Sequence, residues 1–141
     1  MVDFLSIDNK DGFYVFGSLP GTIAATATNY GVIFIAMRPC EILKVSEAHT
    51  NAGSDATAAL NIERLSGTES LNSGDEVLVA DINLNTGAAD TVITRSGVAL
   101  QNTILVAGDR LAIKDIGTLT AVAGVCVTIY LKPLGKGNYG V

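Results

Sequence analysis

The sequence contains no tryptophan, one histidine, two cysteines and three prolines, and only 16% of its residues are charged. The single histidine, His49, has no second histidine at a metal-ligand spacing, so we expect no zinc site. Cys40 and Cys126 form no CxxC pair. We expect Cys126 to be a buried thiol that packs as a small hydrophobe, and a disulfide between the two cysteines stays open as an alternative. The sequence therefore predicts no metal and no cofactor.

Long apolar runs and basic clusters are also missing. The longest uninterrupted apolar run, Val32 to Met37, has the length of a strand, whereas a membrane helix needs roughly 20 apolar residues. The first residues lack the basic stretch of a signal peptide, so we expect synthesis in the cytoplasm. The nine Lys and Arg are scattered and the net charge is −5, which predicts binding neither to nucleic acid nor to a membrane.

Residues with a branched Cβ atom dominate what is present. Val, Ile and Thr together supply 38 of the 141 residues, against eight aromatic residues. Branched side chains pack well on a pleated sheet and crowd a helix turn, so this composition predicts strands. The hydrophobic fraction, 48%, is high for a soluble monomer of this size. Part of this excess is interpreted as subunit interface, and a large, well-filled core remains the alternative.

Short apolar runs alternate with turn sequences from Thr22 onward. Period-2 alternation is clearest after Pro39, where Leu43 and Val45 are expected on one face, and in the last run, where Val125 and Val127 are expected inward. Turn signals recur every 8–12 residues, which is typical of a sandwich or barrel. We therefore expect an all-β fold, an antiparallel, jelly-roll-like β-sandwich over residues 22–133, followed by a tail at 134–141. The expected strands are 22–28, 32–38, 41–49, 57–65, 76–84, 91–94, 103–106, 110–115 and 124–132.

The first 21 residues differ from the rest. Half of the aromatic residues lie here, and the segment also contains turn-forming sequences at 8–12 and 17–21. A segment this short cannot form a core, so we expect an extended N-terminal arm that binds its own domain or a neighbouring surface. The candidate interaction residues are Phe4, Phe13, Tyr14 and Phe16.

Groupings that could support catalysis are weak. The nucleophile motif GxSxG and the phosphate-binding P-loop are absent, and hydrophobic residues follow the calcium-loop-like Asp8 to Gly12 where ligands are needed. The carboxylate pairs Asp75–Glu76 and Asp109/Asp115 lie at strand edges or in turns, where a solvated carboxylate caps the bend. We expect that the protein is not an enzyme.

One turn has a clear physical reading. Gly108 can supply a positive φ angle, and Asp109 can accept backbone N–H groups across the bend. Gly117 and Gly124 are expected to bracket a reversal that leads into the last strand.

The stretch Thr103 to Pro133 also carries a resemblance. Its sequence ILVAGDRLAIK, followed by GTLTAVAGVCVTIYLKP, resembles the closing half of small virion proteins of tailed bacteriophages, and IERLSGT at 62–68 matches the middle of that pattern. The resemblance covers roughly residues 40 to 133. It implies a β-sandwich or jelly roll of the capsid decoration (cement) or head-fibre type. No motif of functional residues accompanies it, so no catalytic or ligand residue is transferred.

The resemblance implies a structural role on the outside of a phage head. The expected partners are the major capsid protein and further copies of the chain, as a homotrimer that holds capsomers together. The alternative is a glycan- or receptor-binding jelly roll of a fibre or tail, for which the candidate sugar-stacking residues are Tyr30, Tyr130 and Tyr139. A cupin-like hydrolase would require a histidine cluster, which the sequence lacks.

Overall fold

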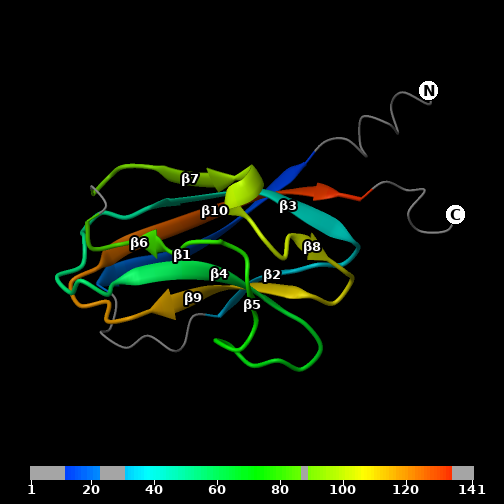
Figure 1. Ribbon diagram of the computed structural model, residues 1–141, viewed down its shortest axis with the longest axis horizontal. Coiled ribbons are helices and arrows are strands. Elements are labelled where there is room, and N and C mark those ends of the chain that lie inside the picture. Colours follow the sequence, from blue (N-terminus) through cyan, green and yellow to red (C-terminus); the bar gives the residue numbers. More distant parts are fainter. Residues whose placement is uncertain (1–11, 23–30, 87–88, 135–141) are drawn as a thin grey trace, which may run out of the picture.

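Two antiparallel β-sheets lie face to face in the computed structural model, which describes residues 12–22, 31–86 and 89–134 (Figure 1). The strands of the first sheet are β1 (Phe13–Thr22), β10 (Ala123–Pro133), β3 (Cys40–Ala48), β7 (Ile93–Ser96) and β8 (Ile104–Leu105). The strands of the second sheet are β2 (Val32–Ile35), β9 (Arg110–Ile116), β4 (Ala59–Leu65), β5 (Asp75–Glu76) and β6 (Ile82–Asn83). A three-residue 3₁₀ helix, η1 (Gly97–Ala99), follows β7. The predicted all-β sandwich is confirmed.

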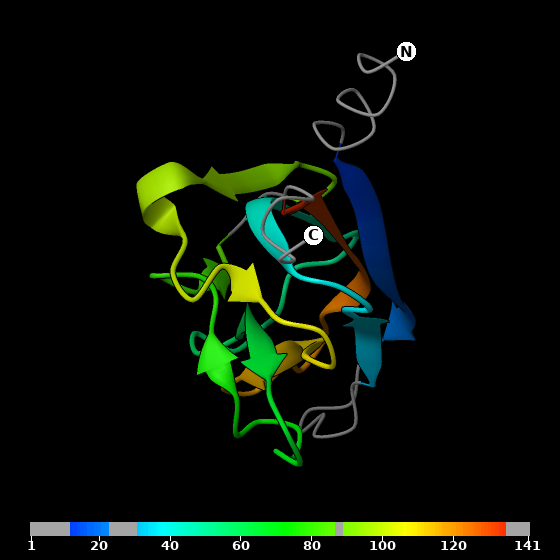
Figure 2. The same cartoon turned by 90° about the vertical axis from the view of Figure 1, so that its right-hand side faces the viewer.

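The order of the strands is that of a jelly roll. The first sheet runs β1-β10-β3-β7 and the second runs β2-β9-β4-β5. Early strands thus pair with late ones in reverse order, β1 with β10 and β2 with β9, as expected when a long hairpin is wrapped into two Greek keys. This wrapping places β1 at one border of its sheet, as Figure 2 shows in dark blue.

The core lies between the sheets. Along β10 every second residue is buried, as the sequence predicts, and these side chains face those of β4 and β9. Alternation works here because successive side chains of a strand point to opposite faces. The largest fully buried side chains are Ile42, Leu60, Ile62, Leu65, Leu78, Ile82, Leu84, Leu105, Leu111, Ile113, Leu119 and Ile129.

A bulge changes the predicted alternation in β3. Leu131 pairs with Ile42 and Tyr130 with Lys44, so Leu43 is the extra residue between them. Ile42 and Val45 are buried, whereas Leu43 is half-buried. The expectation that Leu43 and Val45 lie on one face is therefore wrong, because the bulge shifts the register by one residue.

The expected strand at 76–84 is also broken. Within this stretch only β5 and β6 pair with β4 as strands. The link between them is held by backbone hydrogen bonds, from Val77 N to Ile62 O at 2.7 Å and from Val79 N to Ala99 O at 3.0 Å, and by the side chain of Asn61. Asn61, fully buried on β4, accepts the N–H of Leu78 (2.9 Å) and donates to the carbonyl of Leu78 (3.1 Å) and to Asp81 (2.7 Å). At Leu78 an amide side chain thus makes the hydrogen bonds that the backbone of a continuous strand would make.

Residues 13–22 are part of the sandwich. They form β1, which pairs with β10 from Phe13↔Leu131 to Thr22↔Ala123. Phe13, Tyr14 and Phe16, which were expected in an extended arm, therefore have strand partners on β10. Residues 1–11, the expected strand after Thr22, and the tail after Leu134 lie outside the described residues.

The Gly108 turn is built as the sequence predicts. Gly108 has φ +96°, and the Asp109 carboxylate accepts the N–H of Val106 at 3.0 Å. Gly117 and Gly124 also have positive φ angles, on either side of the loop that leads into β10. In the part of the chain described here, no helix is long and apolar enough to cross a membrane.

Candidate interaction surface

The outer face of the first sheet carries the exposed aromatic residues. On β1, Tyr14 is 65% exposed and Phe16 is 70% exposed, because Val15 and Gly17 occupy the inward positions between and after them. Tyr14 pairs in register with Tyr130 on β10, and the two ring centroids are 4.7 Å apart at 38°. These rings form an aromatic strip along the border of the sheet.

Tyr130 is fixed within this strip. Its hydroxyl accepts the N–H of Gly12 at 3.2 Å, and a side chain at Gly12 would collide with the ring. Among the residues that the sequence suggested for stacking on sugars, Tyr130 is therefore already covered on one side by Tyr14. The other two, Tyr30 and Tyr139, lie outside the described residues.

The four aromatic residues of the predicted arm separate into different environments. Phe13 is partly buried and packs on the core, with its ring centroid 5.7 Å from that of Phe34 on β2. Tyr14 and Phe16 point outward. Phe4 is not among the described residues. Of the predicted set, Tyr14 and Phe16 are the two that the structure brings to a common open surface.

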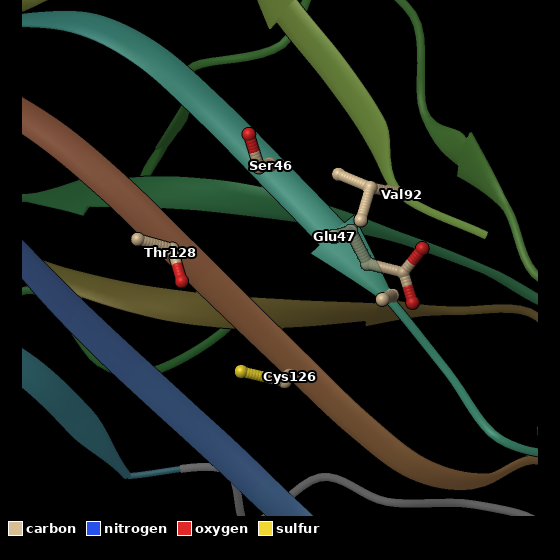
Figure 3. Close-up of a pocket in the computed structure, with 6 residues that line it drawn as sticks. Ser46, Glu47, Val92, Cys126 and Thr128 are labelled. Carbon is tan, nitrogen blue, oxygen red and sulfur yellow. The ribbon is translucent and has the colours of Figure 1, made fainter. Parts of the chain in front are cut away.

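The middle of the same face is lined with small polar side chains. Ser46 on β3 and Thr94 on β7 share a hydrogen bond of 2.9 Å between their hydroxyls. Beside them is a shallow hollow of about 190 Å³, lined in part by Ser46, Thr128 and Cys126 (Figure 3). Glu47 also lines the hollow, and its carboxylate points away from Cys126 in the figure. The hollow thus offers hydroxyls and a thiol, and Glu47 is the one acidic or basic side chain among the described residues that line it.

The two cysteines are free and differ in exposure. Cys126 is exposed on this face, so the expectation of a buried thiol is wrong at this position. Its neighbours Val125 and Val127 take the inward positions, and the period of the strand turns Cys126 outward. Cys40 is the buried thiol, and burial raises its pKa to about 11, with Arg38 opposing this shift and Asp109 adding to it.

The buried carboxylates are structural. Glu63 accepts the N–H groups of Asn72 (2.7 Å) and Gly74 (3.0 Å) and thereby shapes the loop between β4 and β5. Glu47 and His49 form a buried pair at 3.0 Å between Oε1 and Nδ1. Burial raises the pKa of Glu47, and the hydrogen bond from His49 opposes this shift. The second carboxylate oxygen of Glu47 has no hydrogen-bond partner among the described residues.

The candidate catalytic carboxylates do not converge. Asp75 pairs with Arg64 at 2.6 Å, and Glu76 pairs with Lys114 at 2.8 Å. Asp109 caps its own turn, as described above. Within residues 12–22, 31–86 and 89–134, no group of three or more His, Cys, Asp or Glu side chains could hold a metal ion. The described surface thus offers contact area and hydroxyl groups.

A second apolar area lies at the end of the sandwich where β2 finishes. Ala36 exchanges backbone hydrogen bonds with the Gly108 turn, 2.7 Å from Gly108 N and 2.8 Å to Asp109 O. The exposed side chains near this turn are Met37 and Val106. The sequence gives no periodic signal for this area, because these residues lie in loops.

Comparison with known proteins gives a match in fold. No family model matches the sequence, and no curated protein matches it. Among solved structures, the chain is similar to one described as "Cyanophage Pam1 capsid asymmetric unit", with a TM-score of 0.53 and 13% sequence identity. The alignment covers 90% of this chain and 87% of that chain, so the likeness extends over the whole jelly roll. At this identity the comparison shows a shared fold.

Proposed function

We propose that the protein is a structural component of a phage virion, a decoration or cement protein that binds the outside of the head. The observation that carries this proposal is the jelly roll shared with a chain of a cyanophage capsid asymmetric unit over 90% of the present chain. The sequence resemblance at 103–133 points the same way independently, since it rests on residues and not on the fold.

The surface of the protein supports a role in binding. Ionisable side chains of the described core are used to shape loops or are paired with one another, as Glu63 and the Glu47–His49 pair are. The net charge of −5 suits a position away from nucleic acid. The proposed action is mechanical: the rigid sandwich spans a junction between capsomers of the major capsid protein and opposes their separation.

Several copies would act together. We propose three subunits, as the resemblance implies, so that each trimer makes several weak contacts with the shell at once. Once one subunit is bound, the others bind at a high effective concentration, which raises the overall affinity by about 10²–10⁴-fold without any new kind of contact.

Tyr14 and Phe16 are the proposed contact residues. About two thirds of each side chain is exposed, and full burial of such a side chain stabilises by about 1.5–3 kcal/mol. Covering what is now exposed would therefore contribute about 1–2 kcal/mol per ring. Repeated in every subunit of an oligomer, this contribution is large enough to decide between attachment and release.

The test is decoration of phage heads. Purified protein is added to heads of the phage that encodes it, prepared without this protein, and bound protein is measured by co-sedimentation and located by electron microscopy. We expect regular density on the outer surface and heads that break at a higher temperature. Tyr14→Ser should weaken attachment, whereas Val98→Ser, which removes an exposed apolar side chain on η1, should not.

The outcomes separate the alternatives. Absence of density on the heads, with unchanged head stability, overturns the proposal. Attachment to host cells that free sugar abolishes would instead support the glycan-binding jelly roll.

A further inference from the structure

We infer that the β1 edge of the first sheet is a pairing site for the β1 edge of a second copy of the chain. Among the described residues, β1 pairs only with β10, and its backbone makes no hydrogen bond to any other described segment. The opposite border of the strand therefore presents a row of backbone N–H and C=O groups that can accept another strand. This inference rests on β1 alone and stands whether or not the protein decorates a capsid.

The composition of β1 is unusual for an edge. Natural edge strands are protected by charged residues, by proline, by bulges or by being very short. The ten residues of β1 include no charged side chain. The other border strands conform to the rule, since β7 has four residues including Arg95, β2 has four and β5 has two, with Asp75 paired to Arg64.

Protection begins only at the far end of β1. Pro20 cannot donate a backbone hydrogen bond, and the register with β10 shifts between Leu19 and Thr22. The part that is free to pair is thus Phe13–Leu19, and its midpoint is Phe16. An edge that is regular, uncharged and aromatic over this length is a surface that another strand covers.

The segment is complementary to itself. Two copies related by a two-fold axis pair antiparallel, and the greatest overlap of residues 13–19 puts the axis beside Phe16. Phe16 then lies directly opposite Phe16 of the second copy, and Tyr14 lies opposite Ser18. Directly opposed residues have Cβ atoms about 4.5–5.5 Å apart, so the two phenyl rings make a cross-strand aromatic pair.

The area is sufficient for association of moderate strength. A buried aromatic ring contributes about 150–250 Å². With about two thirds of each ring exposed, the four rings of two copies would bury about 400–700 Å², before the backbone edges are counted. Stable interfaces begin at about 1,200 Å² in total, so we expect dissociation constants in the micromolar range. A two-fold contact joins copies in pairs, so a trimer would use a different surface. Pairing through these rings would also compete with the shell contact proposed for Tyr14 and Phe16.

Disulfide cross-linking tests the register. In a Cys126→Ser background, which removes the exposed native thiol, Phe16→Cys should form a covalent dimer of twice 14.6 kDa under mild oxidation. Ser18→Cys alone should not, because residues 18 of the two copies are four positions apart along the strands, about 13 Å. A mixture of the Tyr14→Cys and Ser18→Cys proteins should cross-link, since these positions face each other.

Reversible association is measured in parallel. Native protein at tens of micromolar is compared by light scattering with Phe16→Lys and with the matched surface change Val98→Lys. We expect Phe16→Lys to raise the dissociation constant of the pair at least tenfold with an unchanged circular dichroism spectrum, and Val98→Lys to leave it unchanged.

Three results overturn the inference: no cross-link through Phe16→Cys, equal cross-linking through Ser18→Cys alone, or association that Phe16→Lys does not weaken.

Discussion

Replacing Asn61 by alanine should strongly destabilise the fold. Asn61 is fully buried, and its amide group makes four hydrogen bonds. Its oxygen accepts the N–H groups of Ile62 (2.7 Å) and Leu78 (2.9 Å). Its nitrogen donates to Leu78 O (3.1 Å) and to Asp81 (2.7 Å). Alanine removes all four bonds and adds none.

The size of the effect follows from these contacts. Each hydrogen bond contributes about 0.5–1.5 kcal/mol net. The N–H of Leu78 would in addition remain in the core without a partner, which costs about 1–3 kcal/mol. Since water can partly enter the vacated space, we expect a total of about 3–5 kcal/mol. A protein of this size is commonly stable by about 5–15 kcal/mol, so the variant should remain folded only in part of the usual temperature range.

The free energy of unfolding is measured by equilibrium unfolding in urea. Far-UV circular dichroism follows the transition, because the chain has no tryptophan for fluorescence. Asn83→Ala is the matched control. Asn83 also holds a turn, accepting the N–H groups of Asn85 (2.7 Å) and Thr86 (3.0 Å), but it is exposed and water can replace it. We expect less than about 1 kcal/mol for the control. A difference between the two variants below about 0.5 kcal/mol would refute the idea that Asn61 substitutes for the missing strand.

Three further predictions concern single side chains. In the folded protein a disulfide reagent should react quickly with the thiol of Cys126 and should reach Cys40 only after unfolding. Cys40 is buried and its pKa is raised to about 11, so its reactive thiolate is both inaccessible and rare. Equal reaction rates of the two thiols would contradict the assigned exposures. Glu47→Gln should be more stable than the native protein at pH 7, and this advantage should shrink toward pH 4.5. The reason is that burial raises the pKa of Glu47, so that its ionised form destabilises the folded protein. Urea titrations at several pH values measure the advantage, and one that grows toward low pH would contradict the prediction. Gly108→Ala should lower the melting temperature by a few degrees, because alanine at φ +96° carries about 1–2 kcal/mol of backbone strain. Gly31→Ala is the control, since an added Cβ there meets no atom of the described residues and the backbone has no positive φ. Equal melting temperatures of the two variants would show that the turn tolerates a side chain.

The sequence was most informative where local pattern and long-range pairing agree. The last strand is an example: its Val125 and Val127 are inward because period-2 alternation and burial on one face select the same register. The turn at Gly108 and Asp109 was predictable for a different reason, since the required φ angle and the capping carboxylate belong to adjacent residues.

Features that depend on distant residues were not predictable. The bulge at Leu43 arises only because β10 pairs on both sides of it, and nothing in residues 40–48 marks the extra position. The break between β5 and β6 depends on Asn61, whose side chain reaches a segment 17 residues away. In the sequence Asn61 reads as an outward polar residue of a half-buried strand, whereas the structure buries both faces of β4 there.

The first strand shows how the same residues support two readings. Aromatic rings without charge, followed by Gly17 and Pro20, resemble an arm, because their strand partner, β10, lies more than 100 residues later in the sequence. The jelly-roll wrapping brings that partner alongside and turns Phe13 to the core, while Tyr14 and Phe16 remain outside. The expectation that these aromatic residues bind a neighbouring surface then changes in kind. A flexible arm would become ordered on contact, and its loss of conformational entropy would weaken binding. A strand already held by β10 has lost most of that entropy on folding, so it presents its rings and its backbone edge without this further cost. Association through β1 therefore needs less contact area than association through an arm would, and this favours pairing through the short free edge Phe13–Leu19.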